Sequence, residues 1–159
     1  MKRLTLYLCV CAVLLAGCSA TAHLYPVQGP LAAQNPPPVF VAKMTDGLHS
    51  GNLSVVLNTG EVLRGRWEQV QRPAKPSSGA ASAPSENMSA QWDLVYGQGF
   101  YTAHVLGARL YAKSELKGNQ GTVLYAELYK PDKIQDQQNV ASIKGVAKDD
   151  KGNIYKIAF

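Results

Sequence analysis

The stretch that decides the fold runs from residue 53 to residue 67 and reads Leu53-Ser54-Val55-Val56-Leu57-Asn58-Thr59-Gly60-Glu61-Val62-Leu63-Arg64-Gly65-Arg66-Trp67. Before the turn, Leu53, Val55 and Leu57 alternate with Ser54, Val56 and Asn58. After it, one face carries Leu63, Gly65 and Trp67, and the other carries Arg64, Arg66 and Glu68. Alternation with a period of two on both sides of a short glycine turn predicts an antiparallel β-hairpin.

Further strands are predicted on both sides of this hairpin. Residues 39–44 precede it as a strand, and the turn region 46–51 connects the two. Towards the end of the chain, residues 122–129 form a strand, and residues 143–148 and 154–159 flank the turn 149–153 as a second hairpin. The predicted fold is therefore all-β, a small antiparallel sandwich or barrel of about seven to eight strands.

Three segments between the hairpins are less regular. Residues 91–99 fit either a helical turn or a strand, whereas residues 100–106 read as extended. Residues 108–116 are rich in helix formers, yet their apolar positions also alternate. A strand is favoured there, because a turn at 117–121 and a strong strand follow.

Two segments read as loops. Residues 71–90 are rich in Pro, Ala and Ser and contain almost no side chains that a core would bury. They predict a flexible surface loop inserted between strands, and a functional lid is the sharper alternative. Residues 130–141 form a second, polar loop.

Composition fits one folded domain of modest charge. The chain has 159 residues, of which 46% are hydrophobic and 17% are charged. This supplies a core that needs no disulfide or metal. Loss of Lys2 and Arg3 with a leader lowers the Lys and Arg count from 16 to 14, against 11 Asp and Glu. The remaining basic residues are dispersed, so nucleic acid is not a predicted partner.

The first eighteen residues carry the most specific signal. Met1-Lys2-Arg3 is followed by the uncharged stretch 4–16, which is too short for a transmembrane helix and typical of a signal peptide. The sequence Leu15-Ala16-Gly17-Cys18 then resembles the lipobox of bacterial lipoproteins. The resemblance implies that residues 1–17 are a signal peptide and that Cys18 becomes the N-terminus, bearing fatty-acyl chains such as palmitate. An ordinary leader and an uncleaved anchor are the alternatives.

The same resemblance gives a location. Ser19, directly after the lipidated cysteine, resembles the pattern of lipoproteins sent to the outer membrane. The prediction is a lipid-anchored protein of the cell envelope, in the outer membrane, facing the periplasm or the cell surface. Residues 18–38 read as the lipidated N-terminus and a proline-rich tether, before a β domain at 39–159. Docking of His23, Leu24 and Tyr25 on the domain would order part of that tether.

No residue pattern predicts catalysis, a cofactor or a metal. Cys9 and Cys11 leave with the leader, so Cys18 is the one cysteine of the mature chain, which excludes a cysteine-based zinc site. The histidines His23, His49 and His104 lack metal-ligand spacing. The sequence 149–153 resembles a calcium loop without its distal Glu, so a turn held by Asp side chains is favoured.

One aromatic cluster surrounds the bend Gly97-Gln98-Gly99. Its members are Trp92, Tyr96, Phe100, Tyr101, His104 and Tyr111. Aromatic surfaces bind sugars or proteins. The favoured interpretation is nevertheless that most of these rings fill the core.

These observations favour a non-catalytic binding or structural subunit of the envelope, with no cofactor. Its predicted partners are the membrane, through lipid on Cys18, and another envelope protein, while a small-molecule ligand is left open. One alternative is an enzyme acting on cell-wall or lipid material, with a site assembled from distant residues. Another is a surface-displayed protein that binds a host or a phage.

Overall fold

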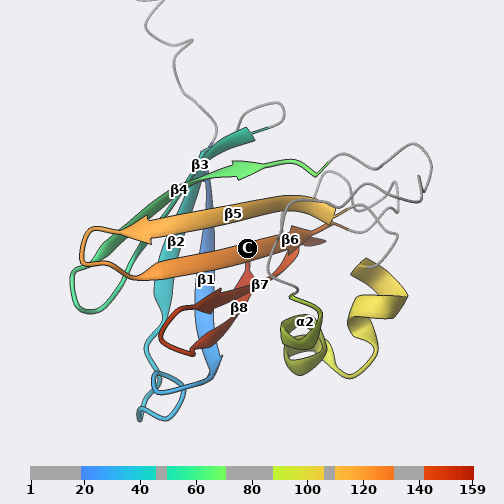
Figure 1. The fold of residues 1–159 in the computed structure, drawn as a ribbon, viewed down its shortest axis with the longest axis horizontal. Coiled ribbons are helices and arrows are strands. Elements are labelled where there is room, and N and C mark those ends of the chain that lie inside the picture. Colours follow the sequence, from blue (N-terminus) through green and yellow to red (C-terminus); the bar gives the residue numbers. More distant parts are fainter. Residues whose placement is uncertain (1–18, 46–49, 71–87, 106–109, 131–141) are drawn as a thin grey trace, which may run out of the picture.

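The computed structural model describes residues 19–45, 50–70, 88–105, 110–130 and 142–159. Strands in these ranges form a closed antiparallel barrel in which each strand pairs with the next and β8 pairs with β1 (Figure 1). The predicted all-β fold is confirmed, and its architecture is a barrel. The strands are β1 (Ser19–Gln28), β2 (Phe40–Thr45), β3 (Ser50–Val56), β4 (Val62–Glu68), β5 (Leu110–Gly118), β6 (Val123–Tyr129), β7 (Lys144–Asp149) and β8 (Ile154–Ala158).

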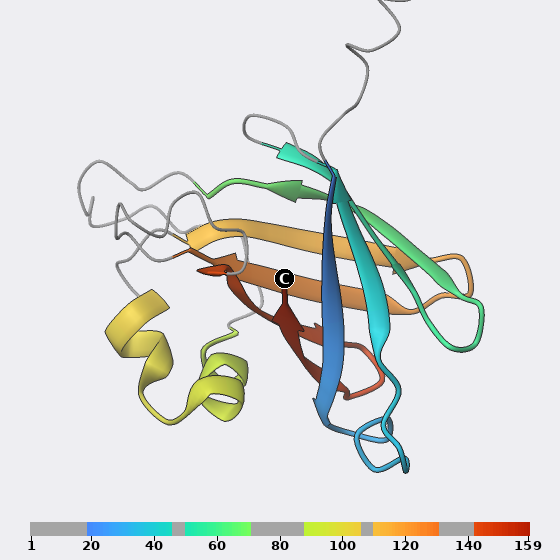
Figure 2. The ribbon, with the colours of Figure 1, turned by 180° about the vertical axis from the view of Figure 1, so that it is seen from behind.

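The two ends of this barrel differ. Because the strands run alternately up and down, the connections β1–β2, β3–β4, β5–β6 and β7–β8 all lie at one end, which we call the turn end. The other end, where β1 begins and β2 ends, we call the N-terminal rim. Figure 2 shows β1 and β2 side by side between these two ends.

The predicted tether is wrong over its first ten residues. Ser19–Gln28 is strand β1, which pairs with β2 on one side and with β8 on the other. Ala22 and Leu24 point into the barrel and are buried, so the β domain begins at residue 19 and not at residue 39. The ladder to β8 is irregular between Pro26 and Gln28, which accommodates a proline in a strand with two neighbours.

The two predicted hairpins are confirmed. In the first, β3 and β4 pair in register from Ser50–Glu68 to Val56–Val62, and Gly60 adopts the positive φ of 81° that its turn requires. In the second, β7 and β8 pair from Lys144–Ala158 to Lys148–Ile154. Their alternating side chains point inward to the core and outward to solvent, as a period of two dictates.

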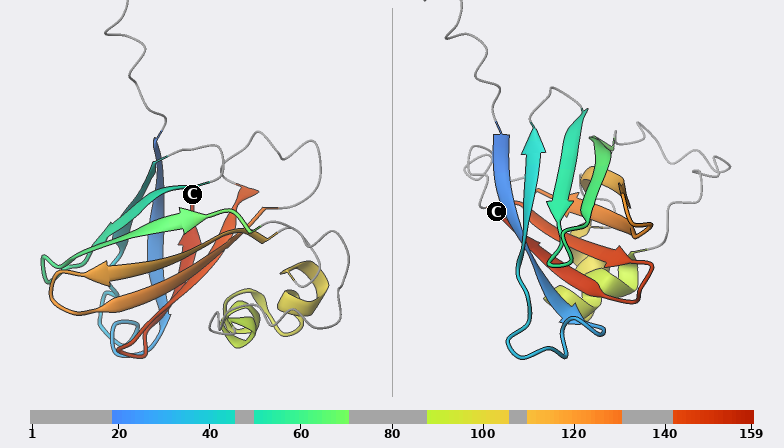
Figure 3. Two further views of the ribbon diagram at one scale, coloured as in Figure 1. Left: turned by 45° about the horizontal axis from the view of Figure 1, so that its top comes forward. Right: turned by 90° about the vertical axis from the view of Figure 1, so that its left-hand side faces the viewer.

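The β4–β5 connection contains the helical part of the fold. Residues 91–99, predicted as helix or strand, contribute most of helix α2 (Ser89–Tyr96), whereas residues 108–116 contribute to strand β5 as predicted. The extended prediction for residues 100–106 is wrong, because a π-helical turn, η2 (Tyr101–Val105), follows α2. Gly97 and Gly99 have positive φ and bend the chain between the two helices. Both helices lie outside the barrel (Figure 3).

The predicted turn starting at Asp46-Gly47 and the predicted polar loop 130–141 fall largely outside the described residues. The same holds for most of the Pro/Ala/Ser-rich loop 71–90, of which residues 88–90 lead into α2. The predicted signal peptide, residues 1–17, also lies outside them.

Candidate functional site

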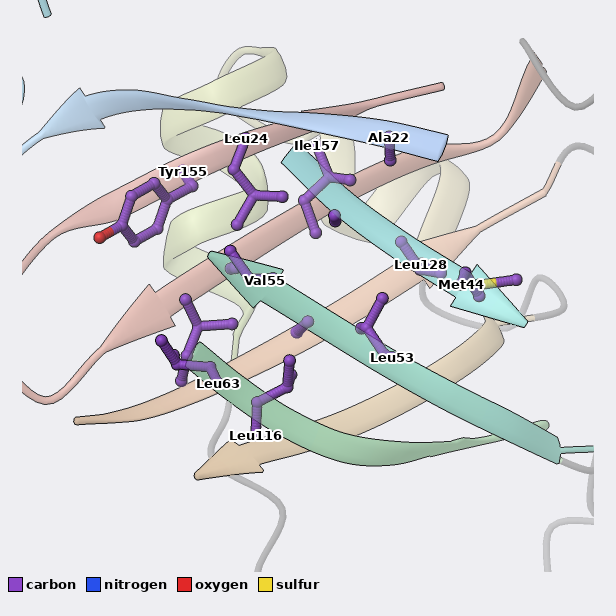
Figure 4. Close-up of a cluster of buried hydrophobic side chains, with 14 of the residues drawn as sticks. Ala22, Leu24, Met44, Leu53, Val55, Leu63, Leu116, Leu128, Tyr155 and Ile157 are labelled. Carbon is purple, nitrogen blue, oxygen red and sulfur yellow. The ribbon is translucent and has the colours of Figure 1, made fainter. Parts of the chain in front are cut away.

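The interior of the barrel is filled by apolar side chains. All eight strands contribute to one buried cluster, and Figure 4 shows side chains such as Leu24, Val55 and Ile157 converging there. The enclosed space that remains between Leu124, Leu128 and their neighbours is about 10 Å³, and apolar residues alone line it. That is close to the smallest space that admits one water molecule. Eight-stranded barrels either fill their interior or hold one small ligand, and this barrel is filled.

Trp67 closes the interior near the N-terminal rim. Its side chain is 1% exposed, and its indole N–H donates to the carbonyl oxygen of Thr45 at 2.9 Å. The indole lies against Gly51, where a Cβ would clash with the ring. Among the described residues, Trp67 therefore packs the interior on the side of the rim where β2, β3 and β4 end or begin.

At the turn end, hydrogen bonds join neighbouring connections. Glu61, 1% exposed after the β3–β4 turn, accepts from the hydroxyl of Thr122 at 2.6 Å and from its amide at 3.0 Å. Lys151 of the β7–β8 turn lies 3.7 Å from the same carboxylate. The hydroxyl of Thr122 is the main reason that the pKa of Glu61 is lowered, against the opposing effect of burial.

A second buried carboxylate organises the β7–β8 turn. Asp149 accepts from the amides of Lys151 and Asn153, from the Asn153 side chain at 2.8 Å and from the Tyr155 hydroxyl at 2.7 Å. Burial first, and the hydrogen bond to Asp149 second, raise the pKa of Tyr155. Asn153 in turn accepts from the amide of Leu31 in the β1–β2 connection. The prediction that Asp holds this turn by side-chain hydrogen bonds is confirmed.

The aromatic cluster packs against the outer wall of the barrel. Trp92 is fully buried and, with Met88 and Val105, covers Tyr129 and Val146 on β6 and β7. Around this centre pack Tyr96, Phe100 and Tyr101, whereas His104 is exposed and lies against the ring of Phe100. The favoured interpretation is confirmed for Trp92, in a core outside the barrel, whereas Tyr96, Phe100 and Tyr101 pack around it and stay partly exposed. The side chain of Tyr111 falls outside the described residues.

Glu127 fixes α2 to the barrel. Its side chain is 6% exposed on the outer face of β6, and its Oε2 accepts from the indole N–H of Trp92 at 2.8 Å. Its Oε1 lies 3.1 Å from the ammonium group of Lys113. Glu127 and Lys113 line a groove of about 570 Å³ along β4, β5 and β6, together with Arg66, Glu68 and Glu115. One carboxylate oxygen of Glu127 thus holds the helix, while the other pairs with Lys113 on β5.

An exposed apolar surface lies on the wall formed by β1, β2 and β3. It consists of Tyr25, Val27, Val39, Val41 and Val56, each 41–52% exposed, and we call it the valine patch. Val41 lies directly opposite Val56 on one side and opposite His23 on the other. The sequence contained a signal for it, because Val56 falls on the polar face of the first hairpin.

The surroundings of the valine patch are basic. Lys43 on β2 and Lys156 on β8 are exposed on the same wall, and Lys156 pairs in register with Tyr25. The described strands β8, β1, β2 and β3 contain no Asp or Glu. The wall therefore combines an apolar centre with positive charge at its edges.

The two described histidines belong to different elements. His23 lies on β1 beside Tyr25 and His104 lies in η2, while His49 is outside the described residues. Within the described ranges, no three His, Cys, Asp or Glu side chains are placed to hold a metal ion. Nor does any described helix have the length and apolar character needed to cross a bilayer.

Cys18, the predicted lipid attachment site, lies outside the described residues, and Ser19 directly after it is the first residue of β1. Comparisons with protein-family models, with curated proteins and with solved structures gave no match. The function is therefore inferred from the residues of this chain alone.

Proposed function

We propose that this protein is a lipid-anchored envelope lipoprotein that acts as a non-catalytic binding subunit through the valine patch. The lipobox at residues 15–18 supports the anchor, with acylation of Cys18 after removal of residues 1–17. Ser19 supports transport to the outer membrane, where the domain faces the periplasm or the cell surface. Two or more acyl chains on one cysteine make such attachment stable.

The valine patch carries the binding part of this proposal. Contiguous apolar side chains on a soluble domain mark interaction surfaces more often than isolated ones do. The patch crosses three neighbouring strands, and its basic edges at Lys43 and Lys156 favour a partner with complementary negative charge. We therefore propose another envelope protein as the partner, with an apolar centre and an acidic rim.

The filled interior supports binding on the outside of the barrel. A carrier of small apolar molecules needs an internal cavity of several hundred Å³. The space enclosed here is about 10 Å³, so the described conformation offers a ligand of that kind no room inside the barrel.

In-cell crosslinking followed by mass spectrometry of the captured proteins tests the proposal. The lipidated wild-type protein is compared with Cys18→Ala, which removes the acyl chains. A discrete envelope protein captured by the wild type and lost in Cys18→Ala is expected. Absence of any protein above that control would count against a subunit role.

A matched pair of variants locates the surface. Val41→Glu places a charge in the valine patch, at a position 43% exposed. Leu94→Glu places the same charge on α2, where Leu94 is 50% exposed and lies outside the patch. Loss of the partner in Val41→Glu and its retention in Leu94→Glu are expected, whereas equal capture by both variants would remove the patch from the proposal.

A further inference from the structure

The junction between the proposed lipid site and the barrel has no spacer. Ser19 follows Cys18 directly and already pairs in register with Thr45 at the end of β2. One extended residue spans at most ~3.6 Å. A tether over residues 19–38 would reach ~60 Å at ~3.1 Å per residue. Because β1 pairs with β2 from Ser19 onward, Cys18 lies within about one residue of the barrel and no such tether separates them.

The N-terminal rim next to this junction is suited to lie against a surface. Trp67 fills the interior just below it, and its bond to the carbonyl of Thr45 ties the core to the edge of β2. Thr45 and Asn52 are also joined across β2 and β3, because the amide of Asn52 donates to the Thr45 hydroxyl at 2.9 Å. The ends of β2 and β3 at the rim can therefore contact another surface while Trp67 stays buried.

We propose that the N-terminal rim, at Ser19, Thr45 and Ser50, rests on the lipid headgroups of the bilayer that holds Cys18. This proposal rests on the proposed acylation of Cys18 and adds the orientation of the domain. The barrel stands on the membrane with its turn end pointing away, and the contact is with lipid headgroups, not with a protein.

The orientation places the valine patch at a defined height. β1 has ten residues, which span ~30 Å at ~3.3 Å per residue and less along the axis of a barrel with tilted strands. The patch lies on the wall between the rim and the turn end, so it is within ~30 Å of the headgroups. A partner that binds it must approach equally close to the membrane.

Fluorescence quenching on vesicles tests the orientation. Full-length lipidated protein is placed in vesicles of phosphatidylethanolamine and phosphatidylglycerol that contain a headgroup spin label. Acylation occupies Cys18, so Thr45→Cys at the rim or Asn58→Cys in the β3–β4 turn supplies a single free thiol for a fluorophore. We expect quenching to be several-fold stronger at position 45 than at position 58.

A spacer variant supplies the matched control. A flexible Gly/Ser segment is inserted between Cys18 and Ser19, beginning with Ser so that the residue after Cys18 is unchanged. The difference between positions 45 and 58 should then largely disappear. Equal quenching at both positions without the spacer would overturn the orientation.

The mass of the purified mature chain separates the two proposals. An acylated chain with equal quenching overturns the orientation alone. A chain that lacks the mass of the acyl groups and does not float with the vesicles overturns both the orientation and the lipid anchor.

Discussion

The turn end and the N-terminal rim close the same barrel by different means. At the turn end, the connections β3–β4, β5–β6 and β7–β8 are short and are joined by side-chain interactions, with Glu61 and Asp149 as buried acceptors. At the rim, a packed indole, Trp67, meets the edge of β2, and the β4–β5 and β6–β7 connections are long. The turn end is thus held by buried polar groups, whereas the rim is held by packing of a large side chain.

The difference has a functional side. Buried carboxylates with several donors hold a turn in one conformation, because each lost bond leaves a desolvated group. In the β4–β5 connection, the described segment 88–105 is instead placed by packing of Trp92 and its neighbours on the outer wall. Binding and membrane contact are proposed for the rim and the wall, whereas the turn end maintains the fold.

The largest effect is expected at Trp92, which docks the long β4–β5 connection. Trp92→Ala removes a fully buried side chain and the bond to Glu127, at a cost of about 3–5 kcal/mol. Because this aromatic cluster is separate from the interior cluster, α2 should undock while the barrel persists. Hydrogen exchange should then accelerate at residues 89–105 and stay slow in β3 and β4.

Leu94→Ala is the control for this effect, because Leu94 is exposed on the same helix, and its change should be within about 0.5 kcal/mol. Equal loss of protection in α2 and in β3 would show that the two clusters unfold together.

The next effect is expected at Asp149, within the turn end. Asp149→Ala leaves the Tyr155 hydroxyl and the Asn153 donors without their acceptor in a buried site. The free energy of unfolding, measured by urea denaturation, should fall by about 2–4 kcal/mol. Asp150→Ala, in the same turn but exposed, should change it by less than about 0.5 kcal/mol. Equal changes in both variants would contradict the role of the buried carboxylate.

A smaller, pH-dependent effect is expected at Glu61. Glu61→Gln weakens the bonds from Thr122 and should cost about 1–2 kcal/mol at neutral pH. The pKa of Glu61 is below its ordinary value of 4.5 in the folded state, so the unfolded chain binds the proton more readily. The ionised group therefore contributes stability above pH 4.5 and loses it as the pH falls through the folded-state pKa.

Urea denaturation at neutral and acidic pH measures this contribution. The difference between wild type and Glu61→Gln should shrink below pH 4.5. Glu68→Gln, at an exposed position on β4, is the control and should change the free energy of unfolding at neutral pH by less than about 0.5 kcal/mol. A difference that does not depend on pH would contradict the lowered pKa.

The smallest effect is expected at the rim itself. Thr45→Ala removes the two exposed hydrogen bonds between the Thr45 hydroxyl and the backbone of Asn52 and should cost less than about 1 kcal/mol, whereas Thr45→Ser keeps the hydroxyl and should cost less still. Thermal unfolding of the two variants measures this. A loss as large as that of Asp149→Ala would mean that both ends depend on polar groups alike.

The hairpins could be predicted because their information is local. In residues 53–67, alternation on both sides of a glycine turn specifies two strands and their register. The helical turn at Tyr101–Val105 could not, because it depends on bends at two glycines and on the bond from the amide of Tyr101 to the carboxylate of Asp93. A period of two does not reveal either feature.

The candidate sites were visible in part. The aromatic cluster was identifiable as a group, yet its position on the outer wall depends on Glu127, which as an outward polar residue of β6 gave no sign of a partner. The valine patch required the register, because Val41 and Val56 become neighbours only when β2 pairs with β3.

By itself, the sequence determined the all-β class and the two hairpins. Only the tertiary structure decided that the sheet closes into a barrel and that residues 19–28 form the closing strand. The physical reason is the origin of the stabilising free energy. β1 is held by hydrogen bonds to β8 at the other end of the chain and by burial of Ala22 and Leu24, and no local periodicity encodes contacts over that separation.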